Sequence, residues 1–164
     1  MASAQIGSFF FVMSLIGCQS NPIVAVDLDE HFFRCRVQPV LERSCATLEC
    51  HGSEQRPLRV FARNRLRLDA DPVQLNLPMR DDELQANFDS AASFAGTPAS
   101  DSFLVRKPLD EDAGGYLHRG RELHRSGDVF GETDNDDYQT LLAWVVGDTE
   151  NPTCAYAGQG EATE

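Results

Sequence analysis

The sequence predicts a small, mainly helical domain with long loops. In two segments, 81–95 and 137–146, apolar side chains recur at the spacing of one buried helix face. A third helix is expected over residues 39–48, because Pro39 stands where a helix can start. Stretches that contain glycine and proline separate these segments, which is typical of loops. The 164-residue length supports one compact domain.

Residues 1–17 are expected to be a signal peptide. They contain no charged side chain, and the apolar run 6–16 is too short to cross a bilayer. The residues before this run lack the basic side chains that such signals usually carry. The four residues that end at Cys18 resemble a bacterial lipobox, which implies a lipid on Cys18 and a tether over residues 18–31. Gln19 would then favour the outer membrane.

The helix at 39–48 should present Cys45 toward the core, with Cys50 and His51 just beyond its end and Gly52 in the following turn. Residues 56–71 hold five arginines among apolar side chains, and this alternation predicts an extended ribbon.

Asp81 or Asp82 is expected to cap the next helix, which should run to about Ala95. One or two further turns are expected over 99–106 before Pro108 stops them.

Residues 113–130 are rich in glycine and predict a loop that carries His118 and His124. Asp134 or Asp136 should cap the last helix, residues 137–146. The tail 155–164 is expected to be disordered.

Two thiols and an imidazole cluster at Cys45, Cys50 and His51. In the common haem-attachment signature, Cys-x-x-Cys-His, the cysteines bond to the porphyrin and the histidine ligates the iron. Four residues separate the cysteines here instead of two, a minority spacing among c-type cytochromes. The alternative is a small disulfide loop that leaves His51 on the surface.

Four further segments, together with this motif, resemble the planctomycete-type cytochrome c domain, which is also frequent in secreted myxobacterial proteins. They are 37–41, 66–69, 102–109 and 137–145. The resemblance covers about residues 37–147 and implies a cytochrome c-like domain over 32–154. It further implies one covalently bound haem c, held by Cys45 and Cys50, with His51 on the iron.

The resemblance also implies that a second iron ligand comes from the loop before the last helix. His124 is expected first, because its segment resembles a His-Gly-Gly-Gly stretch of some relatives, and His118 second. Met79 is the third choice and His31 a further candidate. Three arginines are candidates to pair with the haem propionates, or else pair with nearby carboxylates: Arg63, Arg65 and Arg67.

The chain has five cysteines. With Cys18 on lipid and Cys45 and Cys50 on haem, Cys35 and Cys154 remain, and they are expected to form a disulfide in the oxidising envelope. If Cys45 and Cys50 instead form a disulfide, every cysteine is again assigned. The count therefore supports export without deciding on haem.

These observations favour a membrane-anchored monohaem c-type cytochrome that carries electrons in the periplasm or at the cell surface. The formal charge of −12 argues against nucleic acid and would suit a basic redox partner. No catalytic motif such as Gly-x-Ser-x-Gly or His-Glu-x-x-His occurs, so an enzyme is not expected. The alternative is a haem-free, disulfide-stapled envelope lipoprotein that acts as a structural or interaction module. A zinc site at Cys45, Cys50, His51 and His124 is chemically possible.

Overall fold

The structure is a computed structural model that describes residues 27–96, 98–119 and 128–154. It is mainly helical with long loops, so the predicted fold class is confirmed. The predictions for the signal peptide, the lipid anchor at Cys18, most of the tether and the tail 155–164 lie outside the described residues. In the described part, no helix has the length and apolar character needed to cross a membrane.

The N-terminal helical stretch is longer than expected and begins earlier. It consists of α1 (Glu30–Phe32), a π-helical turn (Phe33–Val37) and α2 (Gln38–Ser44). The side chain of Asp29 caps it by accepting a hydrogen bond from the backbone N–H of Phe32 at 2.8 Å.

Pro39 therefore lies inside this helical stretch and not at its start, which corrects the prediction. A proline ring removes one backbone donor and clashes with the carbonyl four residues earlier. The wider π-helical turn directly before it accommodates such a defect, because its hydrogen bonds join residues five apart. The stretch ends at Ser44 and not at the predicted Leu48.

Helix α3 (Asp81–Ala95) has the predicted bounds but a different cap. Arg80 is the N-cap residue, and the carboxylate of Glu83 accepts a hydrogen bond from the Arg80 backbone N–H at 3.0 Å. The predicted caps Asp81 and Asp82 are instead the first helical residues, where their charge complements the helix dipole.

The last helix, α5 (Asp136–Val146), follows a short α4 (Phe103–Arg106) and a loop. Asn135 caps α5 by accepting hydrogen bonds from two backbone N–H groups, so the predicted caps Asp134 and Asp136 are wrong. Gly147 ends it at a φ of 76°, a conformation that favours glycine.

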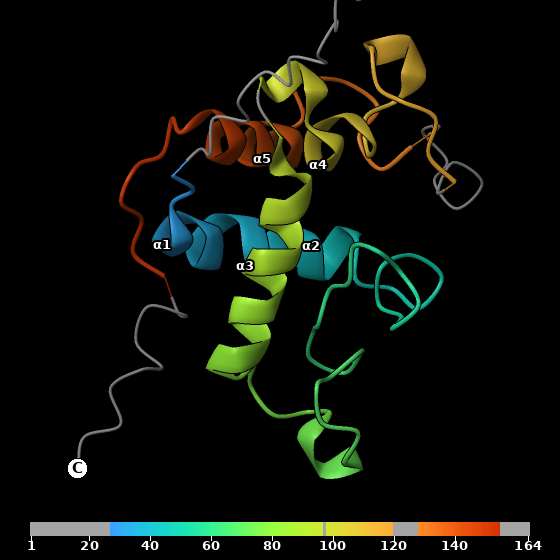
Figure 1. Cartoon of the computed structure of the whole chain (residues 1–164), viewed down its shortest axis with the longest axis vertical. Helices are drawn as coiled ribbons and strands as arrows, with labels where there is room; N and C mark the ends of the chain where they lie inside the picture. Colours follow the sequence, from blue (N-terminus) through green and yellow to red (C-terminus); the bar gives the residue numbers. More distant parts are fainter. Residues whose placement is uncertain (1–26, 97, 120–127, 155–164) are drawn as a thin grey trace, which may run out of the picture.

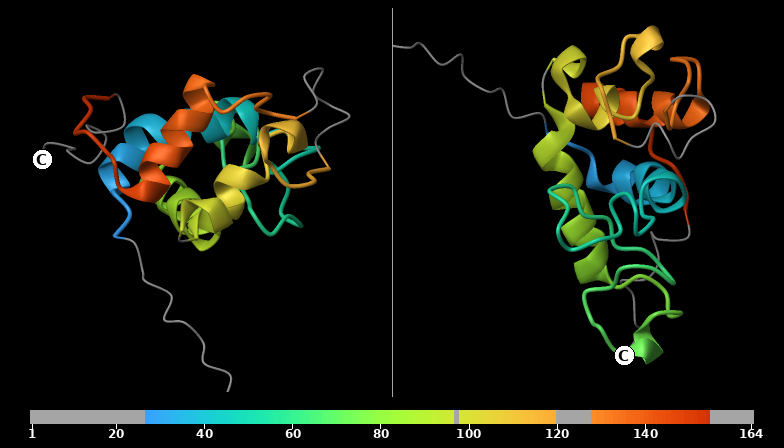
Figure 2. Two further views of the ribbon diagram at one scale, coloured as in Figure 1. Left: turned by 90° about the horizontal axis from the view of Figure 1, so that it is seen from above. Right: turned by 90° about the vertical axis from the view of Figure 1, so that its right-hand side faces the viewer.

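Trp144 on α5 is the centre of the core. Its ring lies 5.1 Å from that of Phe33 and 5.8 Å from that of Phe88 on α3, between ring centroids. The indole N–H donates to the Asp29 carbonyl at 2.9 Å. These contacts fix α5 and α3 against the N-terminal helical stretch, which α3 crosses in Figure 1 and α5 overlies in the left view of Figure 2.

Residues 56–71 form no ribbon of paired strands, which corrects that prediction. Arg67 is instead buried and pairs with the carboxylate of Glu83 through Nε at 2.8 Å and Nη2 at 2.7 Å. The segment thus packs through a buried ion pair against the first turn of α3, on the side of the molecule where the green loops project in Figure 1.

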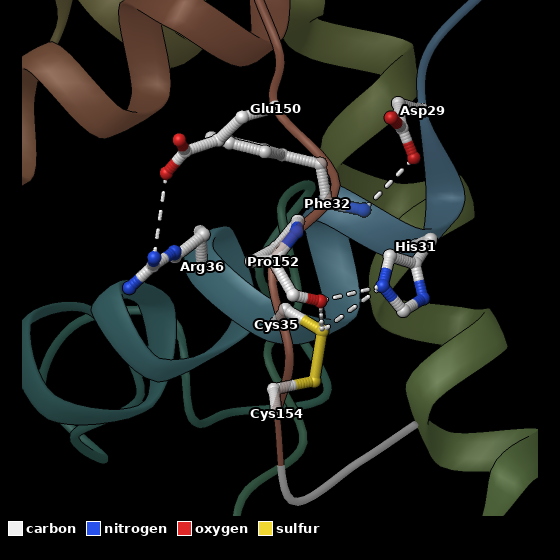
Figure 3. Close-up of a disulfide and its surroundings, with 8 residues drawn as sticks. All are labelled: Asp29, His31, Phe32, Cys35, Arg36, Glu150, Pro152 and Cys154. Carbon is white, nitrogen blue, oxygen red and sulfur yellow. Dashed lines mark hydrogen bonds and ion pairs between the residues drawn. A yellow bond between two sulfur atoms is a disulfide. The ribbon is translucent and has the colours of Figure 1, made fainter. Parts of the chain in front are cut away.

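The disulfide between Cys35 and Cys154, expected from the cysteine count, is present in the structure. It fastens the segment after α5 to the π-helical turn (Figure 3). The imidazole Nε2 of His31 lies 2.8 Å from the Pro152 carbonyl, so it donates to the same segment. The two ends of the described chain are thereby held together.

Candidate functional site

A cavity of about 610 Å³ opens between the end of α2, the turn that follows it, α4 and the loop after residue 114. Its volume lies within the ~300–1,000 Å³ of typical cofactor and ligand sites. Cys45, Cys50, His51 and His118 all contribute to its wall. The rest of the wall is largely apolar, and its apolar members include Leu41, Leu58, Phe94, Phe103, Leu104, Leu117, Val129 and Leu141.

The turn after α2 fixes the position of His51. The backbone N–H of His51 donates to the Cys45 carbonyl at 2.9 Å, and that of Gly52 donates to the Thr47 carbonyl at 2.8 Å. A Cβ atom on Gly52 would lie 2.2 Å from the Ala46 carbonyl oxygen, so this turn closes only around glycine. The glycine that follows His51 is therefore required by the backbone of this turn.

The imidazole of His51 is held from one side. Its Nδ1 donates to the Leu58 carbonyl at 2.9 Å, because a carbonyl oxygen can only accept. The other ring nitrogen, Nε2, is then the nitrogen with a lone pair. A backbone carbonyl that holds Nδ1 in this way is a common support for a metal-binding histidine.

Both cysteines of the motif are free thiols in the structure. Burial raises the pKa of the Cys45 thiol to about 12, and the neighbouring Cys50 and Asp137 add to the shift. Cys50 is half-buried. The Cys45–Cys50 disulfide that the alternative interpretation needs is not formed.

His118 reaches the cavity from the opposite wall. Its Nδ1 lies 3.0 Å from the Oδ1 atom of Asp128, a carboxylate that is almost fully buried. The preceding loop is tied to α4, since the N–H of Tyr116 donates to the Arg106 carbonyl and the Lys107 ammonium donates to the Leu117 carbonyl, both at 2.8 Å. His118 is thus held by its own side chain and by its loop.

The rings of His51 and His118 face the same cavity with centroids 6.0 Å apart and planes inclined by 13°. Burial lowers the pKa of His51, and the nearby His118 and Arg56 lower it further. His51 is therefore kept neutral, the form in which imidazole binds a metal.

The other predicted ligands lie elsewhere. His124 falls outside the described residues. Met79 is buried in a separate cluster with Phe61 and Leu84, and His31 is hydrogen-bonded beside the disulfide. The described residues contain no group of three or more His, Cys, Asp or Glu side chains placed to hold a metal ion, and the predicted zinc set includes His124, which they do not cover.

The arginines expected to meet the propionates do not line the cavity. Arg67 pairs with Glu83, Arg63 donates to the Asn76 carbonyl at 2.7 Å, and Arg65 donates to the Glu42 carbonyl. Among the described residues, the cations that line the cavity are Arg56, Lys107 and Arg119, which the sequence interpretation missed.

The missed cations carry no strong local signal in the sequence. Arg56 follows the motif closely, and its Nη2 donates to the Glu49 carbonyl at 2.8 Å across the turn. Asp128, also missed, contacts His118 in the folded chain although it is not its neighbour in the sequence.

Searches of protein-family models, curated proteins and solved structures find no match for this chain. The site must therefore be interpreted from its own residues. Among the described residues it offers two stacked imidazoles, two free thiols beside one of them and three cations. Ser44 and Glu49 also line it, and the rest of its wall is largely apolar. Such a donor set fits a flat, apolar, anionic macrocycle that carries a metal and two reactive vinyl groups.

Proposed function

We propose that this chain is a c-type cytochrome domain that binds one haem covalently in the cavity, with His51 and His118 as the axial ligands. The observation that carries the proposal is that the two free thiols Cys45 and Cys50 line one largely apolar cavity together with His51 and His118, whose ring centroids lie 6.0 Å apart. Haem, when bound, supplies one-electron redox chemistry. The chain would then be an electron carrier.

The thiols of Cys45 and Cys50 would hold the porphyrin by thioether bonds. Both are free and both line the cavity next to His51, which supports this role. Free thiols do not fit the haem-free alternative, whose second disulfide joins the same two cysteines. We therefore favour the haem protein over the disulfide-stapled lipoprotein.

The remaining wall would bind and orient the macrocycle. Arg56, Lys107 and Arg119 line the cavity and would neutralise carboxylates at the edge of the macrocycle. The apolar side chains that line the rest would exclude water, which lowers the local dielectric and limits access to the metal.

A lipid anchor at Cys18 would place the domain on the outer membrane, in the periplasm or at the cell surface. The formal charge of −12 suits a basic redox partner, since opposite charge speeds the encounter of two proteins at low salt. Both statements depend on the sequence alone.

The test is expression in an envelope that contains the cytochrome c maturation machinery. A reduced α band in the absorption spectrum and a haem stain that survives a denaturing gel are expected. The variant Cys45→Ser/Cys50→Ser should lose the stain, because both thioether bonds are then absent. A colourless wild-type protein under these conditions would overturn the proposal.

A further inference from the structure

We propose that Asp128 is a positioning residue that keeps His118 on the haem iron and makes the reduction potential more negative. The inference rests on the proposed function. It adds that the iron is closed to external ligands, so the domain carries electrons and does not sense small molecules.

The contact between the two side chains is short and shielded. Asp128 Oδ1 lies 3.0 Å from His118 Nδ1, and the Asp128 side chain is only 5% exposed. The same oxygen accepts the backbone N–H of Val129 at 2.7 Å, which fixes the direction of the carboxylate. Hydrogen bonds to a charged group are about twice as strong as neutral ones. The hydrogen bond at Nδ1 therefore fixes the orientation of the His118 ring, including the side that carries Nε2.

The two proposed axial ligands differ in this respect. His51 donates to a neutral backbone carbonyl, that of Leu58, whereas His118 donates to a carboxylate. A carboxylate draws the Nδ1 proton more strongly and so leaves more electron density on the imidazole. A more electron-rich ligand stabilises the oxidised iron relative to the reduced iron. The potential is therefore expected to fall because of Asp128.

The backbone around Asp128 is anchored before any cofactor binds. Phe130, two residues later, donates to the Pro108 carbonyl at 2.8 Å and accepts from the Asp110 N–H at 2.9 Å. This pairing joins the Asp128 segment to the chain that leads into the His118 loop. Releasing His118 from the iron would require the charged hydrogen bond to break or the paired segments to separate. The ligand is thus preorganised, and a small ligand must compete with it.

The test compares Asp128→Asn with Asp110→Asn in the haem-loaded protein. Asp110 is a buried carboxylate on the neighbouring segment that accepts the Asp112 N–H and has no contact with either histidine among its hydrogen bonds. Asp110→Asn therefore removes a charge from the same region without touching His118. Two quantities are measured: the midpoint potential by redox titration, and the affinity of the reduced protein for carbon monoxide.

For Asp128→Asn we expect a more positive potential and about a 10–100-fold gain in carbon monoxide affinity, because the loss of a supporting hydrogen bond typically weakens a metal site by this factor. Asp110→Asn should behave as the wild type in carbon monoxide binding. Equal carbon monoxide affinity in the wild type and Asp128→Asn would overturn the inference. So would equal potential shifts in the two variants, since both would then reflect charge alone.

If Asp128→Asn does not accumulate, nitrogen NMR of the reduced wild-type haem protein carries the test. The chemical shift of His118 Nδ1 should be that of a nitrogen that donates a hydrogen bond to a carboxylate. It should differ from the chemical shift of His51 Nδ1, which donates to a carbonyl. Identical shifts would count against Asp128. A haem-loaded protein that fails these tests overturns only the role of Asp128, whereas a colourless protein overturns the proposed function.

Discussion

His51 and His118 lie on opposite walls of one cavity, with ring centroids 6.0 Å apart. His51 follows the N-terminal helical stretch and His118 belongs to the loop before α5, so only the packed fold brings them together. Each ring is held through Nδ1, by Leu58 and by Asp128. The proposed haem site depends on this pair.

Replacing the distal ligand should change the spectrum without removing the haem. His118→Ala is expected to keep covalently bound haem but to convert the iron to a five-coordinate or water-ligated form, because Cys45, Cys50 and His51 remain. His124→Ala is the matched control and should keep the wild-type spectrum. Absorption spectra of both oxidation states provide the measurement. A changed spectrum in His124→Ala and not in His118→Ala would show that the ligand is His124.

The motif at Cys45, Cys50 and His51 could be recognised from sequence because its residues are neighbours and its chemistry is local. The second ligand could not be selected in the same way. His118 and His124 belong to one glycine-rich segment of the sequence, and the residues around His124 resemble a ligand segment more closely. What distinguishes His118 in the described structure is its contact with Asp128, which depends on how the segments on either side of the loop pair.

The two free thiols should react at very different rates in haem-free protein made without the maturation machinery. With a pKa of about 12, Cys45 at pH 8 is thiolate in only about one molecule in ten thousand, whereas Cys50 is half-buried and more accessible. Iodoacetamide should therefore label Cys50 first. Labelling of Cys45 should rise about tenfold per pH unit between pH 8 and 10.

Mass spectrometry of the labelled peptides measures both rates, with Cys50→Ser as the control that isolates Cys45. Equal labelling of the two thiols at pH 8 would contradict the burial of Cys45. A protein in which neither thiol reacts and no haem is present would point to the Cys45–Cys50 disulfide.

The haem-free domain should lose stability as the pH falls below about 7. His51 has a lowered pKa in the folded state, mainly through burial, while in the unfolded chain its pKa is about 6.5. Between these two values the unfolded state binds more protons, so the free energy of unfolding decreases with falling pH. Below both values the slope from this group disappears.

Urea unfolding at a series of pH values measures the effect. In His51→Leu the slope of the free energy of unfolding against pH should be smaller. The difference is at most the contribution of one proton, which is about 1.36 kcal/mol per pH unit. An unchanged slope in His51→Leu would mean that another group is responsible.

The helix ends show the limits of the sequence interpretation in a different way. The sequence predicts capping by Asp81 or Asp82 and by Asp134 or Asp136, because aspartate is a good N-cap. Asparagine is an equally good N-cap residue. Asn135 caps the helix because its side-chain oxygen accepts hydrogen bonds from the N–H groups of Asp137 and Tyr138. The choice among adjacent cap residues is decided by where packing sets the first turn.

Removing the Cys35–Cys154 disulfide should destabilise the fold without affecting the site. The bond joins residues separated by 119 positions, and loss of a crosslink over so long a loop typically costs about 2–5 kcal/mol. Neither cysteine lines the cavity. Cys35→Ser/Cys154→Ser should therefore unfold at lower urea concentration yet bind haem with the same spectrum. A changed haem spectrum would mean that this end of the molecule supports the cavity.

Gly115 should be essential for the position of His118. A Cβ atom there would lie 1.7 Å from the Leu109 carbonyl oxygen, a backbone atom that cannot move without disturbing the pairing of Leu109 with Phe130. Gly115→Ala is therefore expected to displace the loop and to weaken the bond between His118 and the iron. Covalent attachment through the cysteine motif should survive.

Gly114 is the control for this change. It has a φ of 94°, but a Cβ atom there would meet nothing within 4 Å, so Gly114→Ala should cost only the backbone strain of about 1–2 kcal/mol. Carbon monoxide binding by the reduced protein distinguishes the two variants. Gly115→Ala should bind it and Gly114→Ala should not, because only the first change moves the loop that carries His118. If both variants exclude carbon monoxide, the loop tolerates the displacement and His118 is held by Asp128 alone.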